Sequence, residues 1–114
     1  MSKRVAIVGS RGFRDLAAVD AYVRNLPEDA CIISGGAAGV DQVAEIAAIK
    51  YGRAWQVIRP DYAKHGRGAP KLRNRRIAEE CTRMVAFWDG DSPGTANAVT
   101  HAVELGKPVE IRRG

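Results

Sequence analysis

The chain has 114 residues and carries 18 Lys and Arg against 13 Asp and Glu, a formal net charge of +5 at pH 7. This length suits one compact domain and leaves little room for a second, so we expect residues 1–114 to form a single domain. The apolar runs are too short for a membrane span or a signal-peptide core, and we expect a cytoplasmic protein. The positive balance favours anionic partners without distinguishing nucleic acid from a small phosphate ligand.

Short apolar runs alternate with helical patterns along the chain. We predict strands over residues 4–8, 31–34, 54–59, 83–88 and 108–112. Helices are predicted over residues 15–26, 40–51, 70–82 and 95–105, with a polar loop over 60–69. Apolar strands joined by helices are typical of a parallel sheet that is covered on both faces. The sequence therefore predicts one three-layer α/β domain in which five strands and four helices alternate.

The residue types that most often bind metals or perform redox chemistry are sparse. Cys31 and Cys81 form no CxxC or zinc spacing, and we interpret both as small core residues in a reducing compartment. His65 lies in the polar loop and His101 in the middle of a helix, so neither indicates a metal site. We predict no metal and no cofactor.

In an open parallel sheet, ligands bind beyond the carboxyl ends of the strands. The first loop at that edge is GSRGF, in which Gly9 and Gly12 flank Ser10 and Arg11. The glycines either only turn the chain or bring the backbone, Ser10 and Arg11 to a ligand. The loop lacks the GxGxxG spacing, so the sequence does not support a standard dinucleotide fingerprint.

The second loop, SGGAAGVD, connects a strand to a helix and consists mostly of residues with small side chains or none. Gly35, Gly36 and Gly39 are spaced so that the amides of the helix start face outward, and such a terminus attracts anions. Asp41 is either a favourable acidic residue of the first helical turn or an acceptor for a ribose hydroxyl or a water. The sequence leaves these two roles of Asp41 open.

The loop DGDSPGT after the fourth strand repeats this arrangement. Asp89 begins it, Ser92 and Thr95 supply hydroxyls, and the amides of Gly94 and Thr95 are placed to face an oxyanion. The alternative is a turn that ends in an ordinary Ser or Thr helix cap. Two such loops at one edge of a sheet favour a binding site.

Positive charge concentrates between residues 64 and 83, mainly in the segment HGRGAPKLRNRRI. Helical spacing prevents all of its arginines from facing one ligand. We predict that Arg73 contacts a phosphate and that Asn74 contacts a base or ribose, because they lie nearest the helix start. Arg75, Arg76 and Arg83 are interpreted as solvated or interface charges.

The motifs GSRGF, SGGAAGVD, PKLRNRR and FWDGDSPGTANAV, in this order, resemble the SLOG superfamily. This superfamily contains the DprA DNA-processing proteins and the LOG (lonely guy) nucleotide phosphoribohydrolases, and the chain is most similar to its small YspA-like branch from bacteria and phages. The resemblance covers nearly the whole chain. It implies a Rossmann-like sheet with strand order 3-2-1-4-5, nucleotide-type ligands over the loops, and homodimers. Ala44, Ala47 and Ala48 are candidates for close packing on a second subunit as well as on the sheet.

The resemblance transfers the fold more completely than the activity. LOG enzymes carry a PGGxGTxxE motif whose glutamate helps cleave an N-glycosidic bond. Aligning its glycine and threonine with Gly94 and Thr95 places Asn97 and Ala98 where acidic residues are expected. For catalysis the candidates are therefore Asp41 or Asp89 in place of the glutamate, with Arg73 as the counterpart of the LOG arginine.

The function predicted from these observations is the binding of a nucleotide or nucleotide-derived phosphate ligand, for sensing or sequestration. Trp88 is a candidate to flank a base. The first alternative is a phosphoribohydrolase-like N-glycosidase that acts on nucleoside monophosphates. The second is DprA-like DNA binding through the basic segment 64–83.

Overall fold

The computed structural model describes residues 3–113 and consists of alternating strands and helices. In chain order these are β1 (Lys3–Gly9), α1 (Leu16–Arg24), β2 (Ala30–Ser34), α2 (Val40–Lys50), β3 (Ala54–Val57), α3 (Tyr62–His65), a 3₁₀ helix (Gly66–Gly68), α4 (Ala69–Glu80), β4 (Arg83–Phe87), α5 (Pro93–Glu104) and β5 (Val109–Arg112). All five predicted strands are present. The four predicted helices correspond to α1, α2, α4 and α5.

The five strands form one parallel sheet in the order β3-β2-β1-β4-β5, which confirms the predicted Rossmann-like topology. From β1 the chain winds outward to β3, then crosses to β4 on the other side of β1 and continues to β5. The winding direction therefore reverses between β1 and β4. In folds of this kind the crevice at that reversal is where ligands bind.

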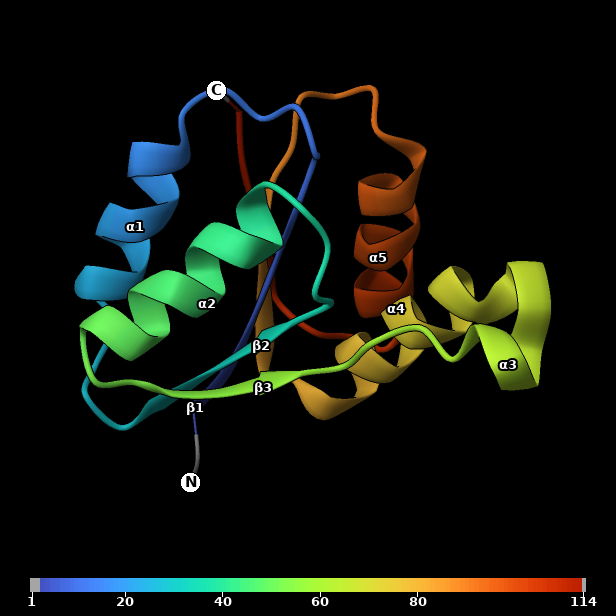
Figure 1. Cartoon of the computed structure of the whole chain (residues 1–114), viewed down its shortest axis with the longest axis horizontal. Coiled ribbons are helices and arrows are strands. Elements are labelled where there is room, and N and C mark those ends of the chain that lie inside the picture. Colours follow the sequence, from blue (N-terminus) through green and yellow to red (C-terminus); the bar gives the residue numbers. More distant parts are fainter. Residues whose placement is uncertain (1–2, 114) are drawn as a thin grey trace.

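Helices cover both faces of the sheet, α1 and α2 on one side and α4 and α5 on the other (Figure 1). The alternation along β1 shows how the sequence produces these layers. Val5 and Ile7 belong to the apolar cluster under α1 and α2, while Ala6 and Val8 belong to the cluster under α4 and α5. Because successive side chains of a strand point to opposite faces, a strand buried on both sides must be apolar throughout.

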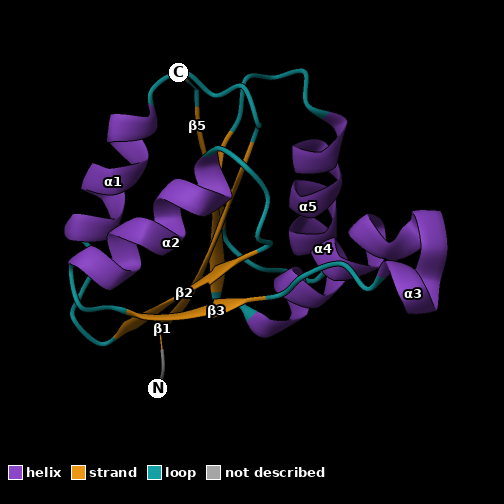
Figure 2. Cartoon of the chain, in the orientation of Figure 1, coloured by secondary structure: helices purple, strands orange, loops and turns teal. Residues whose placement is uncertain are grey.

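The segment predicted as a loop over 60–69 instead contains the short helix α3, which projects beside α4 (Figure 2). Asp61 caps it, since its Oδ1 accepts a hydrogen bond of 3.1 Å from the amide of Lys64. Gly66 ends it with φ of +56°. A helix this short has no apolar periodicity, so the sequence pattern did not predict it.

Several element boundaries also differ from the prediction by one or two residues, and two of these differences have a clear physical reason. Strand β3 ends at Val57 rather than residue 59, and Pro60, which has no amide hydrogen, follows closely. Helix α5 begins at Pro93 rather than residue 95, because the side chain of Ser92 caps it and proline is favoured in the first helical turn.

The alanines of α2 face inward. Ala44, Ala47 and Ala48 are completely buried in the cluster under α1 and α2. They are therefore unavailable to a second subunit, and the suggestion that they contact one is wrong. The exposed apolar residues of this helix are Ile46 and Ile49.

Both cysteines are free, and Cys81 is buried in the cluster under α4 and α5. Cys31 is only partly buried, so its interpretation as a core residue is wrong. Burial raises the pKa of the Cys81 thiol, so it is less reactive than an exposed cysteine. None of the helices in residues 3–113 has the length and apolarity that crossing a bilayer requires.

Gly9, at the end of β1, is enclosed so tightly that we expect Gly9→Ala to destabilise the fold by about 1–3 kcal/mol. A Cβ at this position would lie 2.6 Å from Cγ2 of Val40 and 2.7 Å from the carbonyl oxygen of Phe87, and the latter belongs to a central strand. Urea unfolding measures the change. Gly12→Ala is the matched control, since its Cβ would meet no atom within 4 Å. Equal stabilities of the two variants would contradict the prediction.

Candidate functional site

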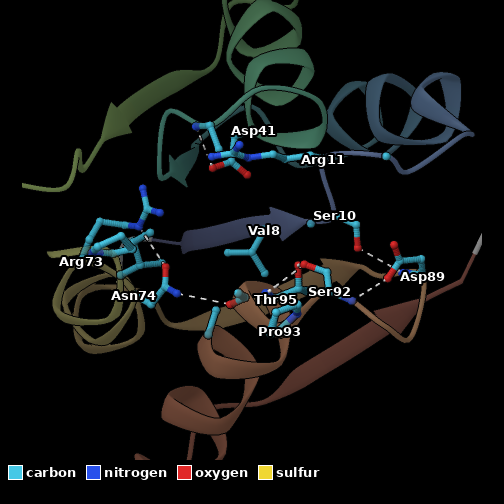
Figure 3. A pocket seen from close by; sticks show the side chains of 17 residues that line it. Val8, Ser10, Arg11, Asp41, Arg73, Asn74, Asp89, Ser92, Pro93 and Thr95 are labelled. Atoms are coloured by element: carbon cyan, nitrogen blue, oxygen red, sulfur yellow. Dashed lines mark hydrogen bonds between the residues drawn. The ribbon is translucent and has the colours of Figure 1, made fainter. Parts of the chain in front are cut away.

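A cavity of about 460 Å³ opens at the carboxyl edge of the sheet, where the winding direction reverses (Figure 3). The loops after β1, β2 and β4, together with residues of α2, α4 and α5, form its wall. Of the thirteen predicted binding residues, ten line it: Gly9, Ser10, Arg11, Asp41, Arg73, Asn74, Asp89, Ser92, Gly94 and Thr95. Segments far apart in the sequence thus meet at one site.

The other three predicted residues, the glycines of the second loop, are not among the residues that line the cavity. An added Cβ would lie 2.5 Å from Nη1 of Arg73 at Gly35 and 2.7 Å from Nη1 of Arg59 at Gly36. At Gly39, where φ is +83°, it would lie 2.7 Å from the carbonyl oxygen of Arg11. These glycines let neighbouring groups approach the backbone rather than presenting it to the cavity.

Asp41 holds the second loop in place. Its Oδ2 accepts hydrogen bonds from the amides of Gly35, at 3.0 Å, and Ala37, at 3.3 Å. The carboxylate therefore occupies two amides of the loop itself, while the predicted role of the amides at the start of α2 stays a prediction. Asp41, whose role the sequence left open, therefore stabilises its own loop by accepting these two hydrogen bonds.

The same carboxyl is only 6 % exposed, and this burial raises its pKa from 3.8 to about 6. The amides of Ala37 and Gly35 and the charge of Arg73 oppose the rise, while Glu45 adds to it. A carboxyl with a pKa near neutrality can hold or release a proton under physiological conditions. Asp41 therefore combines a structural role with the protonation behaviour of a general acid or base.

Arg73 lies in the N-terminal half of α4, and two hydrogen bonds fix the orientation of its side chain. Its Nη1 donates to the carbonyl oxygen of Gly35, and its Nε donates to Oδ1 of Asn74 at 2.9 Å. Burial lowers its pKa and the charge of Arg11 lowers it further, while Asp41 and Tyr62 oppose the fall. A guanidinium has five N–H groups, so three remain to contact a ligand.

Asn74 connects α4 to α5 and is only 7 % exposed. Its Nδ2 donates to the carbonyl oxygen of Gly94 at 3.3 Å and to Oδ1 of Asn97 at 3.0 Å. Together with the bond from Arg73, these contacts use both donors and one acceptor position of the amide. In this arrangement Asn74 positions Arg73 and the start of α5, and its predicted contact with a base or ribose stays a prediction.

The start of α5 contributes hydroxyl groups to the cavity. Oγ of Ser92 accepts from the amide of Thr95 at 3.5 Å and from Oγ1 of Thr95 at 3.2 Å. Because both of these bonds end on the Ser92 oxygen, the hydrogen of Ser92 is left to donate to a ligand. The positive end of the helix dipole adds to the attraction for an anion here.

Ser10 and Asp89 join the loops after β1 and β4. The amide of Asp89 donates to Oγ of Ser10 at 3.2 Å, and Oδ1 of Asp89 accepts from the amides of Asp91 and Ser92 at 2.8 and 2.9 Å. These two amides hold the pKa of Asp89 below its ordinary value of 3.8. Of the two carboxyl groups among the catalytic candidates, Asp89 is therefore the less suited to donate a proton near neutral pH.

Several neighbours of the site were not identified from the sequence. Val8, Ile77 and Ala98 supply an apolar wall, which follows from their positions on β1, α4 and α5 only once these elements are assembled. Trp88 was a candidate to stack on a base, but it packs against the cluster under α4 and α5, and its Nε1 donates to the carbonyl oxygen of Ser92 at 3.1 Å. Trp88 therefore stabilises the loop after β4 and does not line the cavity.

A smaller depression of about 200 Å³ lies beside the cavity and shares Arg73 with it. Its other charged residues include Arg59, Lys64 and Arg76. Arg76 and Arg75 are exposed and paired with Glu80 and Glu79 of the same helix, as their solvated interpretation predicted. Within residues 3–113, no group of three His, Cys, Asp or Glu side chains is placed to hold a metal ion.

Comparison with known proteins is consistent with this architecture. The family model for DNA recombination-mediator protein A matches residues 1–65, more than half of the chain. No curated protein sequence is significantly similar. Among solved structures, DNA processing protein A (DprA) from Streptococcus pneumoniae superposes with a TM-score of 0.83 at 22 % identity, over 96 % of this chain and 50 % of that one. The chain thus spans about half the length of that relative.

Two further structures show the same fold. The protein TM1055 superposes with a TM-score of 0.76 at 20 % identity, over 94 % of this chain and 72 % of that one. DNA processing protein A from Helicobacter pylori, described for its single-stranded DNA binding mode, has a TM-score of 0.73 at 21 % identity, over 96 % of this chain and 64 % of that one. At these identities the superpositions establish the fold, and the family match establishes kinship. The chain therefore belongs to the DNA recombination-mediator protein A family and is a small DprA-related protein of the SLOG superfamily.

Proposed function

We propose that the protein binds a nucleotide or nucleotide-derived phosphate ligand in the cavity at the carboxyl edge of the sheet. The observation that carries this proposal is the convergence of two guanidinium groups, those of Arg11 and Arg73, with the start of α5 on one cavity. A phosphate accepts several hydrogen bonds at once, and Arg73 offers a planar fork that suits it.

The unused donors of the site support the same ligand class. Arg73 retains three N–H groups, Ser92 retains its hydroxyl hydrogen, and the exposed Gly94 lies in the first turn of α5. We favour this position for the phosphate over the second loop, because Asp41 already occupies the amides of Gly35 and Ala37.

The size and composition of the cavity also fit a nucleotide. Its volume of about 460 Å³ lies in the ordinary range for small-molecule sites, roughly 300–1,000 Å³. The polar donors lie beside the apolar wall of Val8, Ile77 and Ala98, so a phosphate and a less polar group can be accommodated together. We further infer a cytoplasmic, homodimeric protein, and its two free cysteines agree with a reducing compartment.

Single-stranded DNA is the second candidate ligand, and a specific observation favours it. The depression with Arg59, Lys64 and Arg76 continues from the cavity through the shared residue Arg73. A strand with one phosphate at Arg73 would meet further positive charge along this surface. The structural similarity to DNA processing protein A of Helicobacter pylori agrees with that possibility.

Calorimetric titration with AMP, adenosine and oligothymidylates of increasing length tests both candidates. We expect AMP to bind at least about tenfold more tightly than adenosine, because charge-assisted hydrogen bonds to the phosphate contribute about 1.5–3 kcal/mol each. Equal affinities for AMP and adenosine would overturn the proposal. Affinity that grows with oligomer length and falls steeply with salt would establish DNA as the ligand instead. Chromatography of the AMP samples for free adenine tests the N-glycosidase alternative.

A further inference from the structure

Strand β5 forms one edge of the sheet, and its outer side is free among the described residues. The amides of Met84 and Trp88 donate to the carbonyl oxygens of Pro108 and Arg112, each at 2.9 Å. Backbone groups alternate in direction along a strand, so the even-numbered residues of β5 face β4. The N–H and C=O groups of Val109 and Ile111 therefore point away from the sheet and are available to another strand.

The side chains of β5 make this edge complementary to itself. Suppose that two copies pair antiparallel with Ile111 facing Ile111 of the second copy. The amide and carbonyl of each Ile111 then bond to those of the other, and Glu110 of each copy faces Arg112 of the other. These flanking positions form the pair type without hydrogen bonds, in which the side chains approach most closely. Two opposite-charge pairs result from one two-fold axis.

The exposure of the same strand supports the pairing. Val109 and Ile111 lie on the same face of the sheet. Val109 packs against the cluster under α4 and α5, whereas Ile111 is 45 % exposed. On that face α5 also exposes Val103, at 62 %. Edge strands of monomeric proteins are commonly protected by charged side chains, lysine above all, which a second strand of the same sequence would meet as like charges if only one sign were present. Here the two charges have opposite signs, and Glu110 and Arg112 already bond each other within one chain at 2.6 Å.

The opposite edge of the sheet lacks this property. The amide of Ile58 donates to Ser34, so Trp55 is the residue of β3 whose backbone groups point outward near the middle of that strand. Its neighbours are Ala54 and Gln56, which carry no charge, and Oε1 of Gln56 accepts from Arg4. Pairing of two β3 strands would therefore create no ion pairs.

We propose that β5 pairs antiparallel with β5 of a second copy, centred on Ile111, to form a homodimer with a sheet continuous across both subunits. This inference rests on the edge of the sheet and is independent of the ligand that the cavity binds. It assigns the dimer interface to the edge strand rather than to the alanines of α2, which are buried.

Sedimentation velocity of the full chain over a range of concentrations tests the pairing. Glu110→Arg and Arg112→Glu should each raise the dissociation constant of the dimer by about tenfold or more, because each creates two like-charge pairs. The double variant Glu110→Arg/Arg112→Glu should restore the dimer, since its pairs are again opposite in sign. A native protein that remains monomeric, or a double variant no better than the single ones, would overturn the proposal.

Two further variants separate pairing from folding. Ile111→Pro removes an outward amide that makes no bond to β4, so the fold should survive while the dimer is lost. Circular dichroism and the thermal midpoint check that the monomer is folded. Trp55→Lys, a charge placed on the other edge strand, is the matched control and should leave the dimer intact. Dissociation by Trp55→Lys together with persistence in Ile111→Pro would place the interface at β3 and refute the assignment.

Discussion

Replacement of Arg73 by glutamine is expected to weaken AMP binding about 10- to 100-fold. The side chain lies on the cavity wall with three N–H groups free, and a hydrogen bond between charged groups contributes about 1.5–3 kcal/mol. Arg73→Lys should recover only part of the loss, because an ammonium group keeps the charge without the planar fork. Calorimetry at constant salt measures each affinity.

Arg75→Gln is the matched control for this experiment. Arg75 lies two residues further along the same helix, where it is exposed and paired with Glu79. Its substitution removes the same charge as that of Arg73. It should change the affinity by less than about twofold. Similar losses in both variants would indicate a diffuse electrostatic effect, and an unchanged affinity in Arg73→Gln would exclude Arg73 from the site.

Replacement of Asp41 by asparagine is expected to strengthen AMP binding roughly tenfold at pH 7.5. Above its pKa of about 6 the buried carboxylate is negatively charged and repels a phosphate in the same cavity, by about 1–2 kcal/mol at an effective dielectric constant near 20. Asparagine nearly preserves the shape and retains an oxygen to accept from the amides of Gly35 and Ala37. The loop should therefore remain ordered.

The pH dependence provides a sharper form of this test. As the pH falls from 7.5 to 5, Asp41 becomes neutral, so the advantage of the Asp41→Asn variant over the native protein should disappear. Phosphate monoesters also titrate near pH 6, and the difference between the two proteins removes this shared contribution. Asp29→Asn, which removes an exposed carboxylate on a loop at the opposite edge of the sheet, is the control. A constant difference between pH 5 and pH 7.5 would contradict the assignment.

The same ionisation predicts a change in the free energy of unfolding. A carboxyl whose pKa rises from 3.8 to about 6 on folding opposes folding once both states are ionised, by at most about 3 kcal/mol. This penalty is complete above pH 6 and absent below pH 4. Urea unfolding should therefore show the native protein gaining stability relative to Asp41→Asn as the pH falls through this window.

Much of the fold was predictable from the sequence because each local pattern agreed with the global one. Strands such as residues 4–8 are apolar throughout, which indicated burial on both faces and hence a parallel sheet. The loops with unusual residues all followed strands, and a parallel sheet necessarily gathers them at one edge. The convergence of Arg11, Asp41, Arg73 and Ser92 on one cavity follows from that topology.

What escaped prediction depends on side-chain directions that spacing does not encode. Nothing in SGGAAGVD distinguishes an Asp41 that bonds its own loop from one that faces a ribose. Similarly, Asn74 and Trp88 are of residue types that often contact nucleotides, but their polar groups are used within the protein. Helix α3 was missed because its stability comes from the Asp61 cap rather than from an apolar stripe.

The hydrogen bond from Arg73 to Asn74 has a consequence for binding energetics. An arginine on a surface normally samples many rotamers, and halting that sampling costs a ligand part of its affinity. In this protein the rotamers of Arg73 are already restricted by folding, when α4 packs against α5. Asn74 and the carbonyl oxygen of Gly35 then each accept a hydrogen bond from the guanidinium. A ligand therefore binds an ordered Arg73 side chain, whose conformational entropy was lost during folding and not on binding.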